Sequence, residues 1–148
     1  MDVQPDFKDL LALFNARKVE YLIVGGYALA FHGSPRLTGD MDLLVRSSRE
    51  NAARFLTALK EFGFGSLGLS EDDFFKEGKV VQLGVPPVRV DILTSMTGVP
   101  WEEAAAGAVA GSYGEVPVKF IGRAALAKNK KAVGRLQDLA DIEALGEK

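Results

Sequence analysis

The stretch GDMDLL, from Gly39 to Leu44, places two aspartates one residue apart inside an otherwise apolar run. In an extended strand alternate side chains share a face, so Asp40 and Asp42 point the same way while Met41 points into the core. Their Cα atoms then lie about 6.6 Å apart, at about 3.3 Å of rise per residue, and both carboxylates can converge on one ion. Without a bound cation the two charges repel each other.

A third carboxylate, Asp91, sits in the apolar stretch VRVDILT. If this stretch pairs beside the strand of Asp40 and Asp42, three carboxylates meet at one place. An oxygen-only ligand set favours Mg²⁺ or Mn²⁺. Arg89 shares the face of Asp91 and is either its ion-pair partner or a phosphate contact. Paired aspartates also occur at solvated strand ends, so the Asp40–Asp42 pair alone does not define a metal site.

Two glycines precede the aspartate pair by thirteen residues. Gly25 and Gly26 end a buried strand and open a short helix, where bare N–H groups and the helix N-terminus can accept a phosphate. A glycine pair of this kind is also common for purely structural reasons. Arg36 and Thr38 lie between the glycines and the aspartates and are further candidate phosphate contacts.

The basic residues near the C-terminus form one cluster, which consists of Lys128, Lys130, Lys131 and Arg135. The ordinary interpretation of such a cluster is a solvated helical face. Arg135 and Asp138, three positions apart, are expected to form an ion pair along a helix.

Composition bounds the kind of protein. The chain has 148 residues, 47% of them hydrophobic, which favours one domain, 1–148, with its own core. The formal charge of −2 gives no general attraction to nucleic acid or anionic membranes. The absence of cysteine and the single His32 exclude disulfides, thiolate sites and histidine-rich metal sites. We see no signal peptide or apolar run long enough to span a membrane, so we expect a cytoplasmic protein.

Hydrophobic periodicity divides the chain into helices and strands. A first helix follows Pro5, and Ser47 and Glu50 form a capping box for a helix that stops at Gly63. The remaining expected elements are strands at 19–26, 41–45, 79–85, 88–94 and 116–122, and helices or helical turns at 27–33, 73–75, 101–106, 123–131 and 135–145. The strands at 79–85 and 88–94 are expected to pair antiparallel through a tight connection at Pro86 and Pro87, and Gly134 is expected to break the last two helices. The order predicts an α/β (α+β) fold with a mixed sheet, helices mainly on one side, a core at about 5–121 and a helical tail at about 122–146.

Three other residues have a structural and a functional interpretation. His32 lies at a helix end and is expected to form a hydrogen bond there rather than reach the mouth of a site. Trp101 and Tyr113 could stack on a base, but packing is the simpler expectation for both. The loop at 65–78 is a candidate mobile segment.

Taken together, IVGGYALAFHGSPRLTGDMDLLV resembles the signature of the DNA polymerase beta-like nucleotidyltransferase superfamily. The signature joins two small residues, a short helix and an Asp-hydrophobic-Asp-hydrophobic run. The match spans Tyr21 to Val45, and Asp91 matches the third carboxylate on a neighbouring strand. The tail ALAKNKKAVGRLQDLADIEAL also resembles small bacterial members related to AbiEii-type toxin nucleotidyltransferases.

The resemblance implies roles for particular residues. Asp40, Asp42 and Asp91 would be catalytic and would hold Mg²⁺ or Mn²⁺, with Asp91 nearest the acceptor. The nucleotide contacts that it implies, together with those suggested by position, are Gly25, Gly26, Arg36, Thr38, Lys128 and Lys130.

The activity that the resemblance implies is transfer of a nucleoside monophosphate from an NTP such as ATP to a hydroxyl acceptor, with release of pyrophosphate. The acceptor would be an RNA such as tRNA, or a protein. A toxin role with an antitoxin partner, and a homo-oligomer, are further expectations. The alternative is a catalytically inactive nucleotide-binding or partner-binding module with the same fold.

Overall fold

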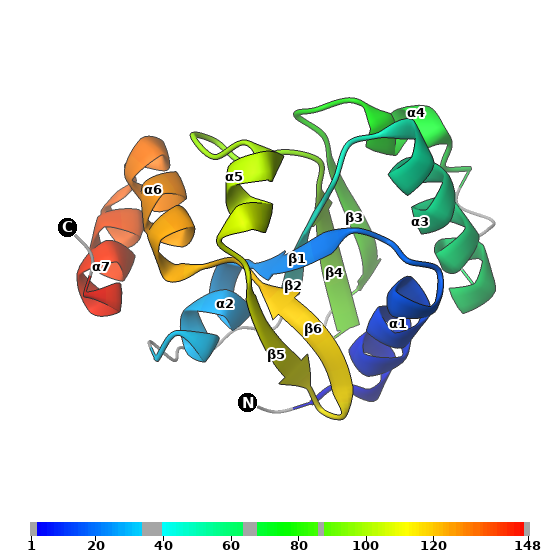
Figure 1. The fold of residues 1–148 in the computed structure, drawn as a ribbon, viewed down its shortest axis with the longest axis horizontal. Helices are drawn as coiled ribbons and strands as arrows, with labels where there is room; N and C mark the ends of the chain where they lie inside the picture. The colour runs from blue at the N-terminus through cyan, green and yellow to red at the C-terminus, as the bar shows by residue number, and fades with distance from the viewer. Residues whose placement is uncertain (1–2, 34–39, 64–67, 86–87, 147–148) are drawn as a thin grey trace.

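The computed structural model describes residues 3–33, 40–63, 68–85 and 88–146, which form a six-stranded sheet with helices on both sides (Figure 1). The strands are β1 Tyr21–Val24, β2 Asp40–Val45, β3 Val80–Val85, β4 Val88–Leu93, β5 Val109–Tyr113 and β6 Val116–Phe120. The helices are α1 Pro5–Ala16, α2 Gly25–Phe31, α3 Arg49–Phe62, α4 Glu71–Phe75, α5 Trp101–Ala106, α6 Arg123–Val133 and α7 Leu136–Leu145.

The sheet is mixed and has the strand order β3-β4-β2-β1-β6-β5. β2 pairs antiparallel with β1 and parallel with β4, and β1 pairs parallel with β6. The predicted α/β class with a mixed central sheet is therefore confirmed, as is the antiparallel β3–β4 hairpin. The helices were expected mainly on one side of the sheet, whereas the structure has helices on both sides. β5 was not predicted, because its sequence VAGSY has small residues and a glycine where strands usually carry β-branched and aromatic ones.

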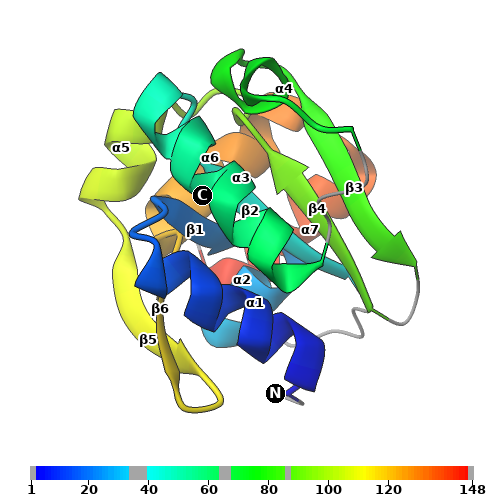
Figure 2. The same ribbon diagram turned by 90° about the vertical axis from the view of Figure 1, so that its right-hand side faces the viewer.

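α1 and α3 cover one face of the sheet, as Figure 2 shows. α1 buries Phe14, as its period of apolar residues predicts, and the Phe14 ring lies 5.1 Å from the Phe55 ring of α3. The ring of Phe55 in turn packs against the ring of Phe74 of α4, with 4.5 Å between the ring centroids. A row of three aromatic rings thus joins α1, α3 and α4.

α3 begins one residue later than the predicted capping box requires. Ser48, rather than Ser47, is the N-cap, and its Oγ accepts a hydrogen bond of 3.2 Å from the backbone N–H of Asn51. The backbone at Ser48 is extended, which allows its hydroxyl to reach this N–H group. The helix ends at Gly63, whose φ of 111° is left-handed, as predicted.

Asn51 ties the start of α3 to the edges of β1 and β2. Its fully buried amide accepts from the N–H of Glu20 at 2.7 Å and donates to the carbonyls of Glu20 and Arg46 at 2.9 Å each. These bonds satisfy backbone groups where β1 begins and β2 ends, so one side chain fixes how the two strands enter the sheet.

The C-terminal helices form a hairpin on the side of the sheet opposite α1 and α3 (Figures 1 and 2). The predicted break between them falls at Gly134, whose φ is 75°. Among the helices of the described ranges, none combines the length and the apolar character that crossing a membrane requires.

Candidate functional site

The parallel pairing of β2 and β4 brings the three predicted carboxylates together. Asp42 lies directly across from Asp91, and Asp40 lies across from Arg89. Met41, between the two aspartates of β2, is fully buried on the opposite face. The strand pairing that the sequence left conditional is thus present, and it gathers Asp40, Asp42, Asp91 and Arg89 into one group, which we call the aspartate cluster.

Gly25 allows the turn between β1 and α2 to pass close to this cluster. Asp42 pairs with Val24, the last residue of β1, and Gly25 follows with a φ of 66°. A Cβ atom on Gly25 would lie 2.1 Å from the Oδ2 atom of Asp42, far inside van der Waals contact. Glycine is therefore required here both for the left-handed backbone and for the close approach of the Asp42 carboxylate.

Asp42 lies in surroundings that disfavour its ionised form. Burial raises the pKa of Asp42 to about 6, and the charges of Asp91 and Asp40 add to this effect, while Arg89 opposes it. A raised carboxyl pKa means that the ionised form is disfavoured where it stands. A further cation bound at the cluster would therefore be stabilised by its charge.

Arg89 is the cation that the structure places there. Its Nε and Nη2 atoms lie 3.0 and 3.2 Å from Oδ1 and Oδ2 of Asp91, which is a two-pronged ion pair. Its Nε atom also lies 3.6 Å from Oδ2 of Asp40. The hydrogen bond to Asp91 is the main reason that the pKa of Arg89 is raised above its usual value. Of the two roles that the sequence allowed Arg89, the structure shows the ion pair.

The donor chemistry of the cluster fits a magnesium or manganese ion, since three carboxylates on neighbouring strands supply hard oxygen ligands. The arrangement in the structure is different. Across the parts of the chain that the structure describes, no group of three or more acidic, histidine or cysteine side chains is arranged to hold a metal ion. Arg89 engages both oxygens of Asp91, so the cluster has the form of a site filled by a guanidinium group.

The predicted nucleotide contacts lie in several places. Gly25 and Gly26 are the first two residues of α2, beside the cluster. Arg36 and Thr38 lie outside the described residues. Lys128 of α6 is exposed and forms an ion pair with Glu103 of α5, with distances of 2.7 and 3.0 Å to its two oxygens. The assignment of these two glycines, Arg36, Thr38 and Lys128 to nucleotide binding stays a prediction.

Lys130 has a different environment from Lys128. Its side chain is only 9% exposed, and its Nζ atom lies 2.9 Å from Asp141 and 3.6 Å from Asp138. Arg135 also pairs with Asp138, at 2.6 Å, as its spacing predicted. To reach a phosphate, Lys130 would have to leave two buried carboxylates, which argues against that role in the arrangement described.

Two residues of β3 that were not predicted from the sequence as site residues also border the cluster. Gln82 pairs with Asp91, and Gly84 pairs with Arg89. The signal was available, because a hairpin that pairs Val85 with Val88 also fixes these two partners. Gly84 has no side chain to place beside Arg89, which leaves room for the guanidinium group.

His32, Trp101 and Tyr113 take structural positions. His32 lies just past the end of α2, and its Nε2 atom is 2.7 Å from the carbonyl oxygen of Ile121. This is the hydrogen bond at a helix end that we expected for His32. Tyr113 is buried, and its hydroxyl accepts a hydrogen bond of 2.7 Å from the N–H of Gln4. Trp101 is partly buried at the start of α5 and packs against the core.

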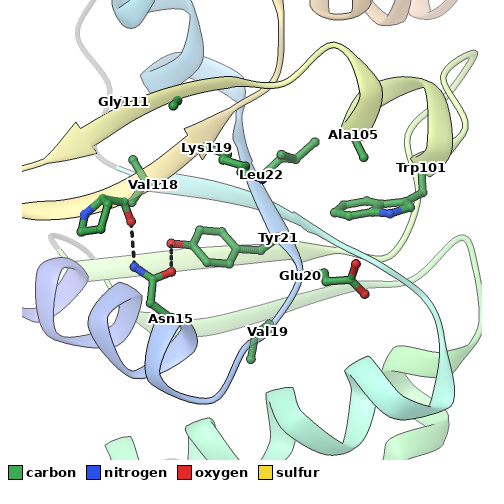
Figure 3. A pocket seen from close by; sticks show the side chains of 12 residues that line it. Asn15, Val19, Glu20, Tyr21, Leu22, Trp101, Ala105, Gly111, Val118 and Lys119 are labelled. Atoms are coloured by element: carbon green, nitrogen blue, oxygen red, sulfur yellow. Dashed lines mark hydrogen bonds between the residues drawn. The ribbon is translucent and has the colours of Figure 1, made fainter.

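The structure also contains a cavity of about 470 Å³ (Figure 3). It is lined by Tyr21 and Trp101, among others, and the Tyr21 hydroxyl donates to Asn15 at 3.0 Å. Tyr21 pairs with Val45 at one end of β2, whereas Asp40 is the first residue at its other end. Burial raises the pKa of the Tyr21 hydroxyl, which stays protonated. The cavity is therefore separate from the carboxylates.

Comparison with protein-family models and with curated protein sequences finds no match for this chain. Comparison with solved structures does. TM1012 from Thermotoga maritima, assigned as a nucleotidyltransferase, has a TM-score of 0.61 and 13% identity over 98% of this chain and 93% of its own. The lincosamide antibiotic adenylyltransferase LnuA has a TM-score of 0.55 and 14% identity over 99% of this chain and 98% of its own.

The antibiotic-resistance factor ANT(2'')-Ia is also similar, with a TM-score of 0.56 and 14% identity over 95% of this chain and 80% of its own. A second structure of that protein contains adenylyl-2''-tobramycin. At identities this low the likeness establishes the fold. The chain has the nucleotidyltransferase fold, over nearly its whole length.

Proposed function

We propose that this protein transfers a nucleoside monophosphate from an NTP to a hydroxyl group of an acceptor, with release of pyrophosphate. The observation that carries the proposal is the register of β2 and β4, which sets Asp42 across from Asp91 and Asp40 two residues away on the same face. The fold that the chain shares with adenylyltransferases supports the same reading.

In the proposed reaction a bond forms between the acceptor oxygen and the α-phosphorus of the NTP, while the bond to the β-phosphate oxygen breaks and pyrophosphate leaves. Mg²⁺ or Mn²⁺ held by Asp40, Asp42 and Asp91 would activate the hydroxyl and neutralise the phosphates. Asp91 is the proposed acceptor of the hydroxyl proton. Gly25 and Gly26, with Arg36, Thr38 and Lys128, are the proposed nucleotide contacts.

The proposed acceptor is a molecule that carries a free hydroxyl group: an RNA such as tRNA, a protein, or a small hydroxylated compound. The last class is added because ANT(2'')-Ia and LnuA are described with tobramycin and lincomycin. Binding of the acceptor would depend on surface shape around the cluster.

The test is an assay of label transfer from α-labelled NTPs in the presence of Mg²⁺, with tRNA, protein and aminoglycoside or lincosamide acceptors offered in turn. We expect transfer to at least one acceptor, with loss of at least about 100-fold in Asp40→Ala and in Asp42→Asn, because each removes a charged ligand. Asp6→Asn, an exposed aspartate of α1, is the matched control. Transfer that is equal in the wild type and in Asp42→Asn would contradict the proposal.

A second candidate is a nucleotide-binding or partner-binding module without turnover. Two observations favour it: the Arg89 guanidinium group binds both oxygens of Asp91, and the described residues include no group of three or more potential ligands arranged to hold a metal ion. Calorimetry separates the two candidates. Tight NTP binding that does not change with Mg²⁺ favours the module, whereas Mg²⁺-dependent binding that is lost in Asp42→Asn favours the enzyme.

A toxin role with an antitoxin partner is a narrower proposal, supported only by the likeness of the tail to AbiEii-type proteins. Induced expression should then arrest growth of a bacterial host, and Asp40→Ala should relieve the arrest. Normal growth at high expression of the wild type in a host without an antitoxin would contradict it.

A further inference from the structure

Arg89 contacts two of the three carboxylates that the proposed function assigns to a metal ion. It lies two residues before Asp91 on β4 and directly across from Asp40 on β2, so all three side chains project from one face. The guanidinium group binds Asp91 through two nitrogens at 3.0 and 3.2 Å, and its Nε atom is 3.6 Å from Asp40. It therefore bridges the two strands.

These contacts place a positive charge where a divalent ion would bind. Each oxygen of Asp91 accepts one hydrogen bond from Arg89, so an ion that binds either oxygen would lie close to the guanidinium group. A guanidinium group and a divalent cation also repel each other at short range. Arg89 and the ion therefore compete for the same carboxylates.

The position of Arg89 allows it to leave. Its side chain is 29% exposed, so the guanidinium group reaches solvent without crossing the core. The position across from it on β3 is Gly84, which adds no side chain to confine it. Asp91 is 15% exposed and Asp40 is 38% exposed, so Asp91 is the deeper of the two carboxylates and needs a compensating charge more.

We propose that Arg89 is a resident cation that neutralises the aspartate cluster when no divalent ion is bound, and that metal binding displaces it toward the phosphates of the nucleotide. This inference rests on the proposed function and adds a further phosphate-binding residue to it. An arginine fork matches two phosphate oxygens as well as it matches a carboxylate, so the group exchanges one anionic partner for another. The nucleotide and the metal ion then bind cooperatively, because each stabilises the displaced position of Arg89.

The first experiment titrates the metal-free protein with Mn²⁺ in a calorimeter, without nucleotide, for the wild type and Arg89→Gln. We expect Arg89→Gln to bind Mn²⁺ about 10- to 100-fold more tightly, since the ion no longer breaks a charged hydrogen-bonded pair. Arg46→Gln is the matched control, because Arg46 makes an ion pair with both oxygens of Glu20, at 3.2 Å each, at the opposite end of β2. Its Mn²⁺ affinity should equal that of the wild type.

A second measurement guards against misfolding. Thermal unfolding without metal should begin at a lower temperature for Arg89→Gln than for the wild type, and saturating Mn²⁺ should raise the unfolding temperature of the variant more. If Arg89→Gln is unfolded without metal, Arg89→Lys keeps the charge but not the fork. It should fold and should bind Mn²⁺ with an affinity between those of the wild type and Arg89→Gln.

A third measurement tests the exchange of partners. At saturating Mn²⁺ the NTP should bind the wild type about tenfold more tightly than Arg89→Gln, the reverse of the order for the metal alone.

The outcomes separate this inference from the proposed function. Equal or weaker Mn²⁺ binding by Arg89→Gln, in a protein whose wild type binds Mn²⁺ at the cluster, overturns the role of Arg89 and leaves the enzyme proposal intact. No Mn²⁺ binding by either protein overturns both. Equal NTP affinity of the wild type and Arg89→Gln at saturating Mn²⁺ overturns the proposal that Arg89 moves from Asp91 to the phosphates.

Discussion

A Cβ atom on Gly25 would lie 2.1 Å from the Oδ2 atom of Asp42, so the glycine that opens α2 and the carboxylate at the centre of the cluster are fitted to each other. The left-handed φ of 66° at Gly25 adds a second reason for glycine. The sequence analysis predicted that Gly25 contacts a phosphate. In the structure Gly25 also allows the turn after β1 to lie close to Asp42.

Gly25→Ala should therefore lose both stability and activity. We expect a loss in the free energy of unfolding greater than the roughly 1–2 kcal/mol that left-handed backbone costs alone, because Asp42 must also move. Urea unfolding measures the first effect and label transfer the second. Gly33→Ala is the control, since Gly33 has a φ of 93° but open space around its Cβ position. If Gly25→Ala proved no less stable than Gly33→Ala, that result would contradict the close approach.

Lys130→Met should destabilise the helical tail, whereas Lys128→Met should not. Lys130 pairs with two buried aspartates, and its removal leaves Asp141 without its lysine partner, which should cost on the order of 3 kcal/mol. Lys128 makes an exposed pair worth at most about 1 kcal/mol. Chemical unfolding of the two variants measures the difference. A stable Lys130→Met variant with weakened NTP binding would instead make Lys130 a phosphate contact.

The tail should also lose stability in acid. The hydrogen bond from Arg135 holds the pKa of Asp138 below its usual value, against the opposing effect of burial. A carboxyl group with a lowered folded-state pKa stabilises the fold above its unfolded pKa, about 3.9, and this contribution is lost as the pH falls through the folded-state value. Asp138→Asn should therefore be less stable than the wild type at pH 7, with a gap that closes below about pH 4. Urea unfolding at pH 7, 4 and 3 measures the gap, and a constant gap would rule out this assignment.

Asn51→Ala should reduce stability by about 3 kcal/mol. The substitution removes three hydrogen bonds to backbone groups, of which the carbonyl of Glu20 keeps a second donor in the N–H of Arg46. A buried backbone group left unsatisfied costs about 1–3 kcal/mol. Thr57→Ala on the same helix is the control, because the exposed Thr57 hydroxyl bonds to the carbonyl of Ala53 within the helix itself. It should change stability by no more than about 0.5 kcal/mol. Equal effects of the two substitutions would show that Asn51 does not anchor the strands.

Hydrophobic period and turn chemistry were sufficient to predict most of the elements that hold the cluster. The apolar alternation around Asp40 and Asp42 predicted their shared face, and the hairpin around residues 86–87 predicted an antiparallel pair. The pairing of β2 with β4 was only conditional, because parallel partners far apart in the chain leave no local signal. β5 was missed because its small residues gain strand structure from pairing with β6 rather than from propensity.

The charges were harder to predict than the elements. Spacing placed Arg89 beside Asp91 but did not decide between ion pair and phosphate contact, which depends on what else is bound. The burial of Lys130 could not be read from a basic run, since α7 folds back on α6 and brings Asp138 and Asp141 to it. Ser47 and Ser48 are adjacent and carry the same hydroxyl group, so the sequence did not decide which of them is the N-cap. The backbone geometry at Ser48 decides it.

The central claim is that Asp40, Asp42 and Asp91 bind a divalent ion together with a nucleotide. The measurement that tests it most directly is a crystal structure of the protein soaked with Mn²⁺ and a non-hydrolysable ATP analogue, with anomalous scattering to locate the metal. We predict an anomalous peak between the three carboxylates, triphosphate oxygens beside it, and Arg89 turned away from Asp91. An analogue bound without a peak at the cluster, with Arg89 still paired to Asp91, would contradict the account.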